Sequence, residues 1–151
     1  MDLLKLERKP GTGRHFTVFR GKTWLGDLDW KSRWPRLMNA DATIAAASGY
    51  YDLRTRRGRP VMSFGGEEVA SRRSEGTFTG AFDSFRLDGA VSGWAIVGMD
   101  GQLRLDAFRN GDSFDIEAAP DAKAGQLPLL ILFAHYAWQA SIDKATRWGA
   151  G

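Results

Sequence analysis

Residues Gln126 to Asp143 read QLPLLILFAHYAWQASID, and this stretch decides the fold. On a helix its apolar residues occupy every side and leave no polar face wide enough to meet water: Leu127, Leu129, Leu130, Ile131, Leu132, Phe133, Ala134, Tyr136, Ala137, Trp138, Ala140 and Ile142. A helix that is apolar on all sides must be surrounded, either by protein or by lipid.

The expected helix covers residues 126–145, with Pro128 in its first turn, where the missing N–H of proline costs nothing. A helix that spans a membrane needs roughly 20 predominantly apolar residues. This run is shorter and contains His135 and Gln139. We therefore interpret it as a buried core helix and not as a transmembrane segment.

The composition is that of one globular domain, residues 1–151. Hydrophobic residues make up 43% of the chain and aromatic residues 12%, which is enough to build a sizeable core. Cysteine is absent, so disulfide bonds and thiolate chemistry are excluded. No secretory signal is recognisable, so we expect a cytoplasmic protein, with peripheral membrane contact as an option.

Upstream of the helix, short runs rich in β-branched and aromatic residues alternate with turn signals, as in a β-meander. Asp100-Gly101 and Asn110-Gly111 are two-residue hairpin signals. In the run 23–30, we expect Trp24, Gly26, Leu28 and Trp30 on one face. The expected strands cover residues 14–20, 23–30, 50–56, 61–64, 67–73, 77–87 with a bulge near Ser84, 93–99, 102–109 and 113–117, and Asp88-Gly89 is an expected turn. Residues 3–6 favour a first strand or arm, and residues 42–47 a strand or a helical turn.

A helix with its side chains is about 10 Å across. A barrel of about eight strands is filled by its own side chains, so a barrel that encloses a helix needs more strands, as in the eleven-stranded cans with a central helix. The sequence therefore predicts a mainly β (α+β) protein. Its fold is a closed antiparallel β-barrel of about 10–12 strands around one buried hydrophobic C-terminal helix.

The segment GWAIVGMDGQLRLDAFRNGDSFDIE (residues 93–117), followed by LPLLILFAHYAWQA (residues 127–140), resembles the closing hairpins and core helix of the tubby-like superfamily. This superfamily includes the tubby C-terminal domain, the LURP-one-related proteins and the phospholipid scramblases. The resemblance implies a twelve-stranded barrel and, in some members, binding of anionic phospholipids or phosphoinositides. The cysteine-rich and proline-rich segments of scramblases are absent, so it does not imply scrambling.

Positive charge is concentrated in the first half of the chain. Residues 1–75 contain 15 Lys and Arg against 9 Asp and Glu, whereas residues 76–151 contain 6 against 9. Six arginines are the candidate ligand-binding residues: Arg54, Arg56, Arg57 and Arg59 around one expected turn, with Arg72 and Arg73 on a strand expected nearby. Guanidinium groups match the geometry of phosphate. The alternative is a charged hairpin that keeps the domain soluble.

Neither a metal site nor a catalytic centre is predicted. No G-x-S-x-G, P-loop or H-E-x-x-H pattern occurs, and no Asp or Glu cluster has the spacing of metal ligands. His135, Gln139 and Asp143 recur every fourth residue and so share one stripe of the helix. They are either buried groups bonded to strands and to each other, or a polar site at the barrel mouth with His135 as its titrating group.

Three classes of function stay open. The first is a non-catalytic module that binds anionic phospholipid through the arginines, with an aromatic anchor such as Trp34 or Tyr50. The second is a protein-interaction or structural domain that uses exposed tryptophan. The third is an enzyme or small-ligand carrier with a cavity of roughly 300 Å³ or more beside His135. Nucleic-acid binding is not favoured, because the net charge is only +3 and no recognition motif occurs. No cofactor is expected.

Overall fold

The computed structural model describes residues 2–10, 14–31, 41–73, 76–80, 85–99, 103–119 and 126–149, with only the backbone for Leu103 and residues 144–149. In this part of the chain, twelve strands precede one helix. They are β1 (Asp2–Arg8), β2 (His15–Arg20), β3 (Thr23–Trp30), β4 (Ala42–Ala46), β5 (Gly49–Arg56), β6 (Arg59–Phe64), β7 (Glu67–Arg72), β8 (Phe78–Gly80), β9 (Phe85–Ala90), β10 (Gly93–Gly98), β11 (Leu103–Asn110), β12 (Ser113–Ala118) and α1 (Leu127–Gly149).

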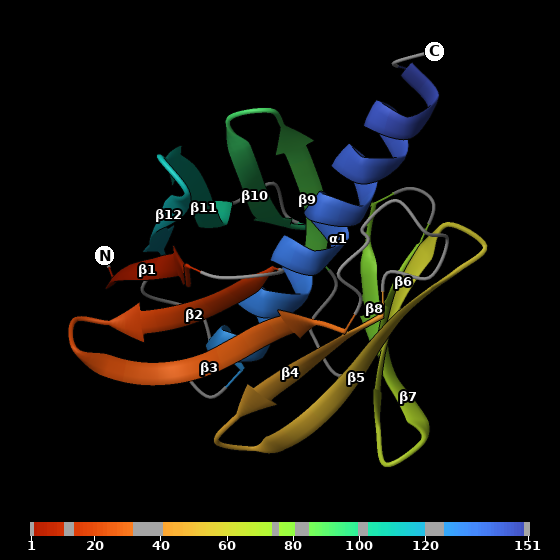
Figure 1. Ribbon diagram of the computed structural model, residues 1–151, viewed down its shortest axis with the longest axis horizontal. Coiled ribbons are helices and arrows are strands. Elements are labelled where there is room, and N and C mark those ends of the chain that lie inside the picture. Colours follow the sequence, from red (N-terminus) through yellow and green to blue (C-terminus); the bar gives the residue numbers. More distant parts are fainter. Residues whose placement is uncertain are drawn as a thin grey trace.

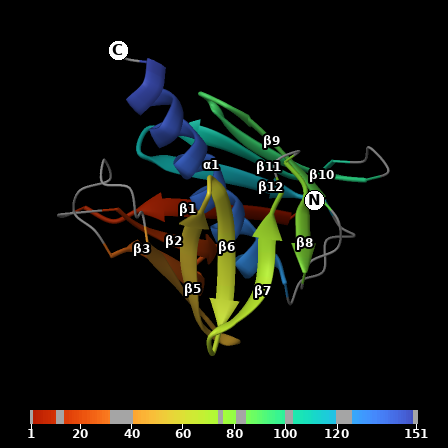
Figure 2. The ribbon, with the colours of Figure 1, turned by 90° about the vertical axis from the view of Figure 1, so that its right-hand side faces the viewer.

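The strands form one antiparallel sheet in the order β8-β7-β6-β5-β4-β3-β2-β1-β12-β11-β10-β9. The two ends of this order, β8 and β9, are joined by a bridge between Thr77 and Arg86 and by a hydrogen bond of 2.8 Å from the Leu87 N–H to the Gly76 carbonyl. The sheet is therefore a nearly closed barrel, and α1 runs through it (Figures 1 and 2).

The helix is enclosed because it is apolar all round. Every residue from Ile131 to Ala137 has an exposed fraction of 0%. These residues pack against the inward-facing residues of the strands, such as Leu28, Leu53 and Ile96. The predicted barrel around a C-terminal core helix is confirmed. No helix in the described residues is long and apolar enough to cross a membrane.

The helix lies close to the barrel wall at a position of β3 where the wall has no side chain. A Cβ built on Gly26 in β3 would lie 3.0 Å from the Leu132 Cδ1 and 3.0 Å from the Ala45 carbonyl oxygen. Contacts this short are tighter than real Cβ contacts allow without a shift of the neighbouring atoms. Glycine at this position therefore lets α1 lie directly against β3 and β4.

Several predictions about strand geometry and turn positions were wrong. Trp24 does not share the inner face with Gly26, Leu28 and Trp30, because the β2–β3 register shifts next to Val18, and Trp24 is exposed. The extra residue of a bulge moves every side chain beyond it to the other face.

The expected strand over residues 77–87 is instead two strands, β8 and β9. Asp88 and Gly89 belong to β9, and the turn lies one residue beyond its end, at Val91 and Ser92. Residues 42–46, for which two interpretations were open, form a strand. The expected bulge near Ser84 and the Asp100-Gly101 turn lie outside the described residues.

Candidate functional site: the arginine hairpin

The strands β5 and β6 carry arginines on their outer face because the side chains of their inner face pack in the core. Leu53 on β5 is fully buried and pairs with Met62 on β6. Since successive side chains of a strand point to opposite faces, Arg54 and Arg56 point outwards, and both are exposed. We call Arg54, Arg56, Arg57 and Arg59 the arginine hairpin.

The turn of the hairpin is unusual for its sequence. Arg57 and Gly58 have φ angles of 51° and 77°, as in a two-residue turn with both central residues left-handed. Such turns favour Asn-Gly or Asp-Gly. Among the described residues, Arg57 is the one non-glycine residue with a positive φ. A side chain in this conformation costs about 1–2 kcal/mol.

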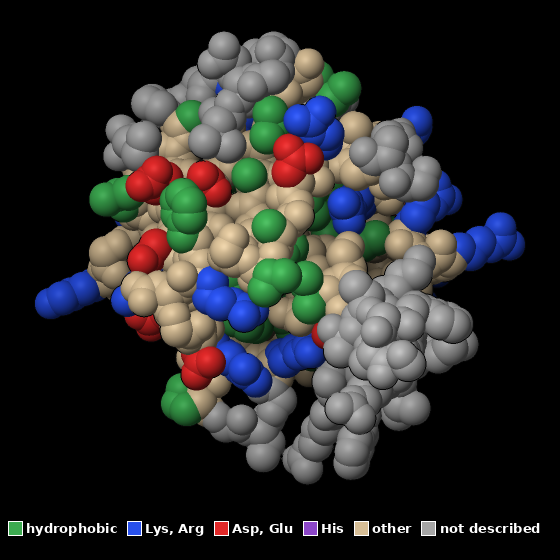
Figure 3. All heavy atoms as spheres, turned by 90° about the horizontal axis from the view of Figure 1, so that it is seen from above, with side chains coloured by type: hydrophobic (Ala, Val, Ile, Leu, Met, Phe, Trp, Pro, Cys, Tyr) green, Lys and Arg blue, Asp and Glu red, His purple; other side chains and the backbone are tan. Residues whose placement is uncertain are grey.

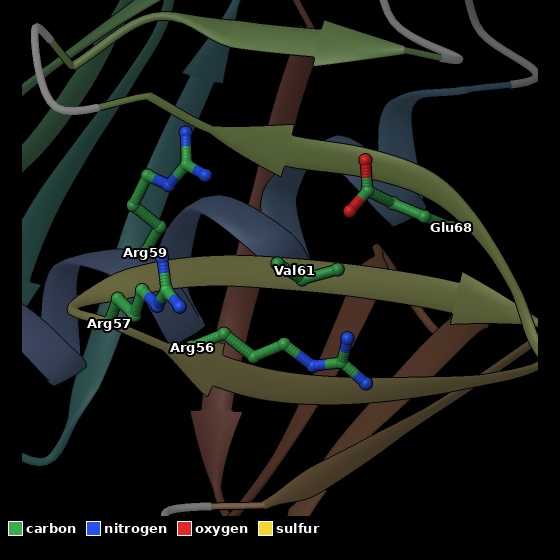
Figure 4. Close-up of a pocket in the computed structure, with 5 residues that line it drawn as sticks. All are labelled: Arg56, Arg57, Arg59, Val61 and Glu68. Carbon is green, nitrogen blue, oxygen red and sulfur yellow. The ribbon is translucent and has the colours of Figure 1, made fainter.

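The arginines border a depression of about 390 Å³ on the outer surface, which is lined by Arg56, Arg57, Arg59, Val61 and Glu68. Figure 4 shows Val61 on β6 between Arg56, which extends along β5, and Glu68 on β7. Arg57 and Arg59 lie at the end of the hairpin. The depression thus has an aliphatic side chain between walls of opposite charge.

The charges of this depression are not neutralised within the described part of the chain. No described carboxylate lies within ion-pairing distance of any arginine of the hairpin, although other surface arginines such as Arg20 and Arg86 are paired. Arg56 and Arg59 are also direct cross-strand partners. Like charges directly opposite each other destabilise a sheet. The hairpin therefore concentrates positive charge at a local energetic cost.

The structure separates the two remaining candidate arginines. Arg72 follows Ala70 on the inner face of β7, where its Nη1 donates a hydrogen bond of 3.1 Å to the Ser141 hydroxyl of α1. Burial lowers the pKa of its guanidinium. Arg73 lies just beyond β7 and is exposed. The paired residues of β6 and β7 end at Val61 and Ser71, two residues before Arg73. Thus Arg73 is an exposed residue outside the arginine hairpin, and Arg72 holds the helix.

An aromatic side chain shares the outer face of β5 with these arginines. Tyr50 is 78% exposed and lies an even number of residues from Arg54 and Arg56, hence on the same face. Phe64, at the far end of β6, is also exposed. Trp34, the other expected anchor, lies outside the described residues. Lys and Arg side chains are also spread over the end of the barrel towards which α1 runs (Figure 3).

His135 is part of the core. Its ring is fully buried, and its Nδ1 accepts a hydrogen bond of 3.2 Å from the Trp94 indole N–H. Four aromatic rings surround it, those of Phe16, Phe114, Trp94 and Trp138. Burial, with the charges of Arg109 and Arg14, lowers the pKa of His135 to about 3. This packing supports the structural interpretation, and the depression described above lies elsewhere, on the outer surface.

The other polar residues of the same helix stripe bond to each other and to a strand. Asp143 accepts two hydrogen bonds from the Arg14 guanidinium, of 2.6 and 2.9 Å, and a third of 3.2 Å from Gln139. The Arg14 guanidinium also lies 5.7 Å from the centre of the Trp30 ring. These contacts fix the end of the helix to β2 and β3.

Two features of the outer surface were not predicted. Glu68 was not a candidate residue, although it lines the depression. His15, to which the sequence assigns no role, lies 3.4 Å from Asp27, which also accepts a hydrogen bond of 2.6 Å from the Thr17 hydroxyl. Burial opposes ionisation of Asp27, but hydrogen bonds from Thr17, Trp24 and His15 outweigh it and lower its pKa. Within the described residues, no group of three or more His, Asp and Glu is placed to hold a metal ion.

Comparison with known proteins identifies the fold and no more. No family model matches the chain, and no curated protein matches it. Among solved structures, the chain is similar to the X-ray structure of a protein from Arabidopsis thaliana, with a TM-score of 0.61. The match covers 89% of this chain and 91% of that one at 14% sequence identity. The two proteins share the barrel with its C-terminal helix. Membership of the tubby-like superfamily stays a prediction.

Proposed function

We propose that this protein is a non-catalytic module that binds anionic phospholipid at a membrane surface through the arginine hairpin. The observation that carries the proposal is the set of outward-facing arginines around a depression, which have no carboxylate partner among the described residues, with Arg57 held in an unfavourable backbone conformation. Strain retained at one exposed position points to a function for that side chain. A purely solvating residue there gains nothing over asparagine or aspartate.

The expected strength of this contact is modest. Each basic residue near an anionic membrane contributes about 1 kcal/mol. The arginine hairpin would thus contribute about 4 kcal/mol, which corresponds to a dissociation constant near 1 mM. Tyr50 supports the proposal because aromatic rings with a polar tip favour the membrane–water interface. With several such contacts on one face, the protein would bind the membrane surface reversibly. The binding would weaken as the salt concentration rises, because salt screens exposed charges.

Changing Arg54, Arg56, Arg57 and Arg59 together to Ala is expected to abolish co-sedimentation with vesicles that contain anionic lipid. The loss follows from the removal of about 4 kcal/mol, or nearly a thousandfold in affinity. Vesicles with phosphatidylserine, with a phosphoinositide, or with phosphatidylcholine alone are compared.

The matched control changes four other exposed basic residues to Ala, namely Lys5, Arg8, Lys9 and Lys22. It alters the net charge equally and is expected to retain most of the binding. Equal binding by the wild type and the hairpin variant would rule the arginine hairpin out.

Arg57→Asn separates binding from stability. Asparagine is favoured in the left-handed position of the turn, so the free energy of unfolding is expected to rise by about 0.5–1 kcal/mol. Affinity for anionic vesicles is expected to fall about fivefold, because one cation is lost. Denaturant unfolding and co-sedimentation measure the two effects. A variant that is more stable and binds equally well would show that Arg57 has no part in binding.

A further inference from the structure

The depression beside the arginine hairpin contains a carboxylate that an ordinary anion site would exclude. Glu68 is exposed on β7 and lines the depression opposite Arg56 (Figure 4). These two residues lie on strands separated by β6, so their backbones are about 10 Å apart. No described cation lies within ion-pairing distance of the Glu68 carboxylate, because the ion pairs of the described residues involve other carboxylates.

A site with two unpaired walls of opposite charge favours a ligand that carries both charges. A phosphate group accepts hydrogen bonds from the guanidinium groups of Arg56, Arg57 and Arg59. An ammonium group attached to the same headgroup then reaches towards Glu68. The Val61 side chain lies between the walls, where it would contact the short carbon chain that joins the two groups. A headgroup with several phosphates and no cation would instead be repelled by Glu68.

Resting on the proposed function, we infer that the depression selects headgroups in which a primary ammonium group, with N–H bonds to donate to Glu68, is linked to the phosphate, as in phosphoserine and phosphoethanolamine. In this arrangement Glu68 is the residue that determines specificity, and the arginines supply the general attraction to anions. The same chemistry occurs in a lipid headgroup and in a free phosphoamine.

The test compares two kinds of phosphatidylcholine vesicle, one with phosphatidylserine and one with an equal mole fraction of phosphatidylglycerol. Both lipids carry one net negative charge, and only the first carries a primary ammonium group. The quaternary ammonium of the phosphatidylcholine in both vesicles has no N–H to donate to a carboxylate. The wild type is expected to bind the phosphatidylserine vesicles about threefold to fivefold more tightly, which is the effect of an exposed ion pair. In Glu68→Gln this ratio is expected to fall to about one.

The matched control is Glu67→Gln, which removes the same charge from the neighbouring residue, outside the residues that line the depression. It is expected to keep the wild-type ratio. A wild-type ratio near one, or an unchanged ratio in Glu68→Gln, would overturn the inference. Thermal unfolding of both variants verifies that they are folded.

Competition with soluble phosphoethanolamine and with glycerol phosphate separates the lipid from a free source. Stronger displacement by phosphoethanolamine supports recognition of the phosphoamine itself, and equal displacement by the two contradicts it. The outcomes also separate the two proposals. If the Arg→Ala hairpin variant loses all vesicle binding while Glu68→Gln keeps the wild-type ratio, only the present inference fails. If the hairpin variant binds like the wild type, both fail.

Discussion

His135→Asn is expected to make the free energy of unfolding depend less on pH between about pH 6.5 and pH 3. The side chain is fully buried, and its pKa falls from 6.5 to about 3 in the folded state. The unfolded chain therefore takes up a proton in this range and the folded chain does not. Stability that is fully present above pH 6.5 is lost as the pH falls.

The size of the effect follows from the shift. Each unit of pKa difference is worth about 1.4 kcal/mol. At pH 4.5, about two units below the pKa of the unfolded chain, the free energy of unfolding is therefore expected to be about 3 kcal/mol lower than at pH 7 because of His135. Asparagine cannot be protonated in this range, and its amide oxygen can replace Nδ1 as acceptor for the Trp94 indole. Denaturant unfolding at several pH values measures the slope for both proteins.

Asparagine is smaller than histidine, so the variant is expected to be less stable at pH 7 as well, and the slope alone is the readout. Other groups also contribute to acid sensitivity. The pKa of Asp27 is lowered in the folded state, so its ionised carboxylate contributes stability that both proteins are expected to lose at low pH. The difference between the two slopes isolates His135. Identical slopes would mean that water reaches the ring, and so that α1 is not sealed in the barrel.

The fold was predictable because its main signals are local. An all-round apolar helix requires enclosure, and this requirement needs no knowledge of distant contacts. Turn residues such as Asn110-Gly111 mark where strands end, although the observed β11–β12 turn lies at Gly111 and Asp112, one residue beyond the expected position. The helix extends to Gly149, beyond the expected end at residue 145, since nothing in its last residues terminates it. Proline and glycine are absent between Leu129 and Trp148.

What the sequence could not provide was register. A bulge next to Trp24 turns that ring outwards, and no residue pattern in β3 reveals it. The face of Arg72 follows from alternation with Ala70, but its contact with Ser141 depends on where α1 lies. The arginines near the β5–β6 turn could be named from the sequence. Glu68 could not, because it enters the depression only through the pairing of β6 with β7, which itself contains a register shift.

Phe133→Ala tests the enclosure of α1 most directly. The Phe133 ring is fully buried and stacks on Phe78 of β8, with ring centres 5.2 Å apart. Removing a buried phenylalanine in a barrel interior leaves a cavity and is expected to lower the free energy of unfolding by about 3–5 kcal/mol. That is a large share of the total stability of a domain, about 5–15 kcal/mol. Phe133→Leu is expected to lose about half as much and keeps the measurement possible if the alanine variant does not fold.

The deciding measurement is the free energy of unfolding of these variants beside that of Phe108→Ala. Phe108 is the same residue type on the outer face of β11, where it is 49% exposed. With α1 inside the barrel, the change at position 133 costs several kcal/mol, and the change at position 108 costs about 1 kcal/mol or less. Equal and small losses of unfolding free energy at both positions would show that the helix lies outside the barrel. This result would contradict the fold and the placement of the arginine hairpin on the outer face of the barrel.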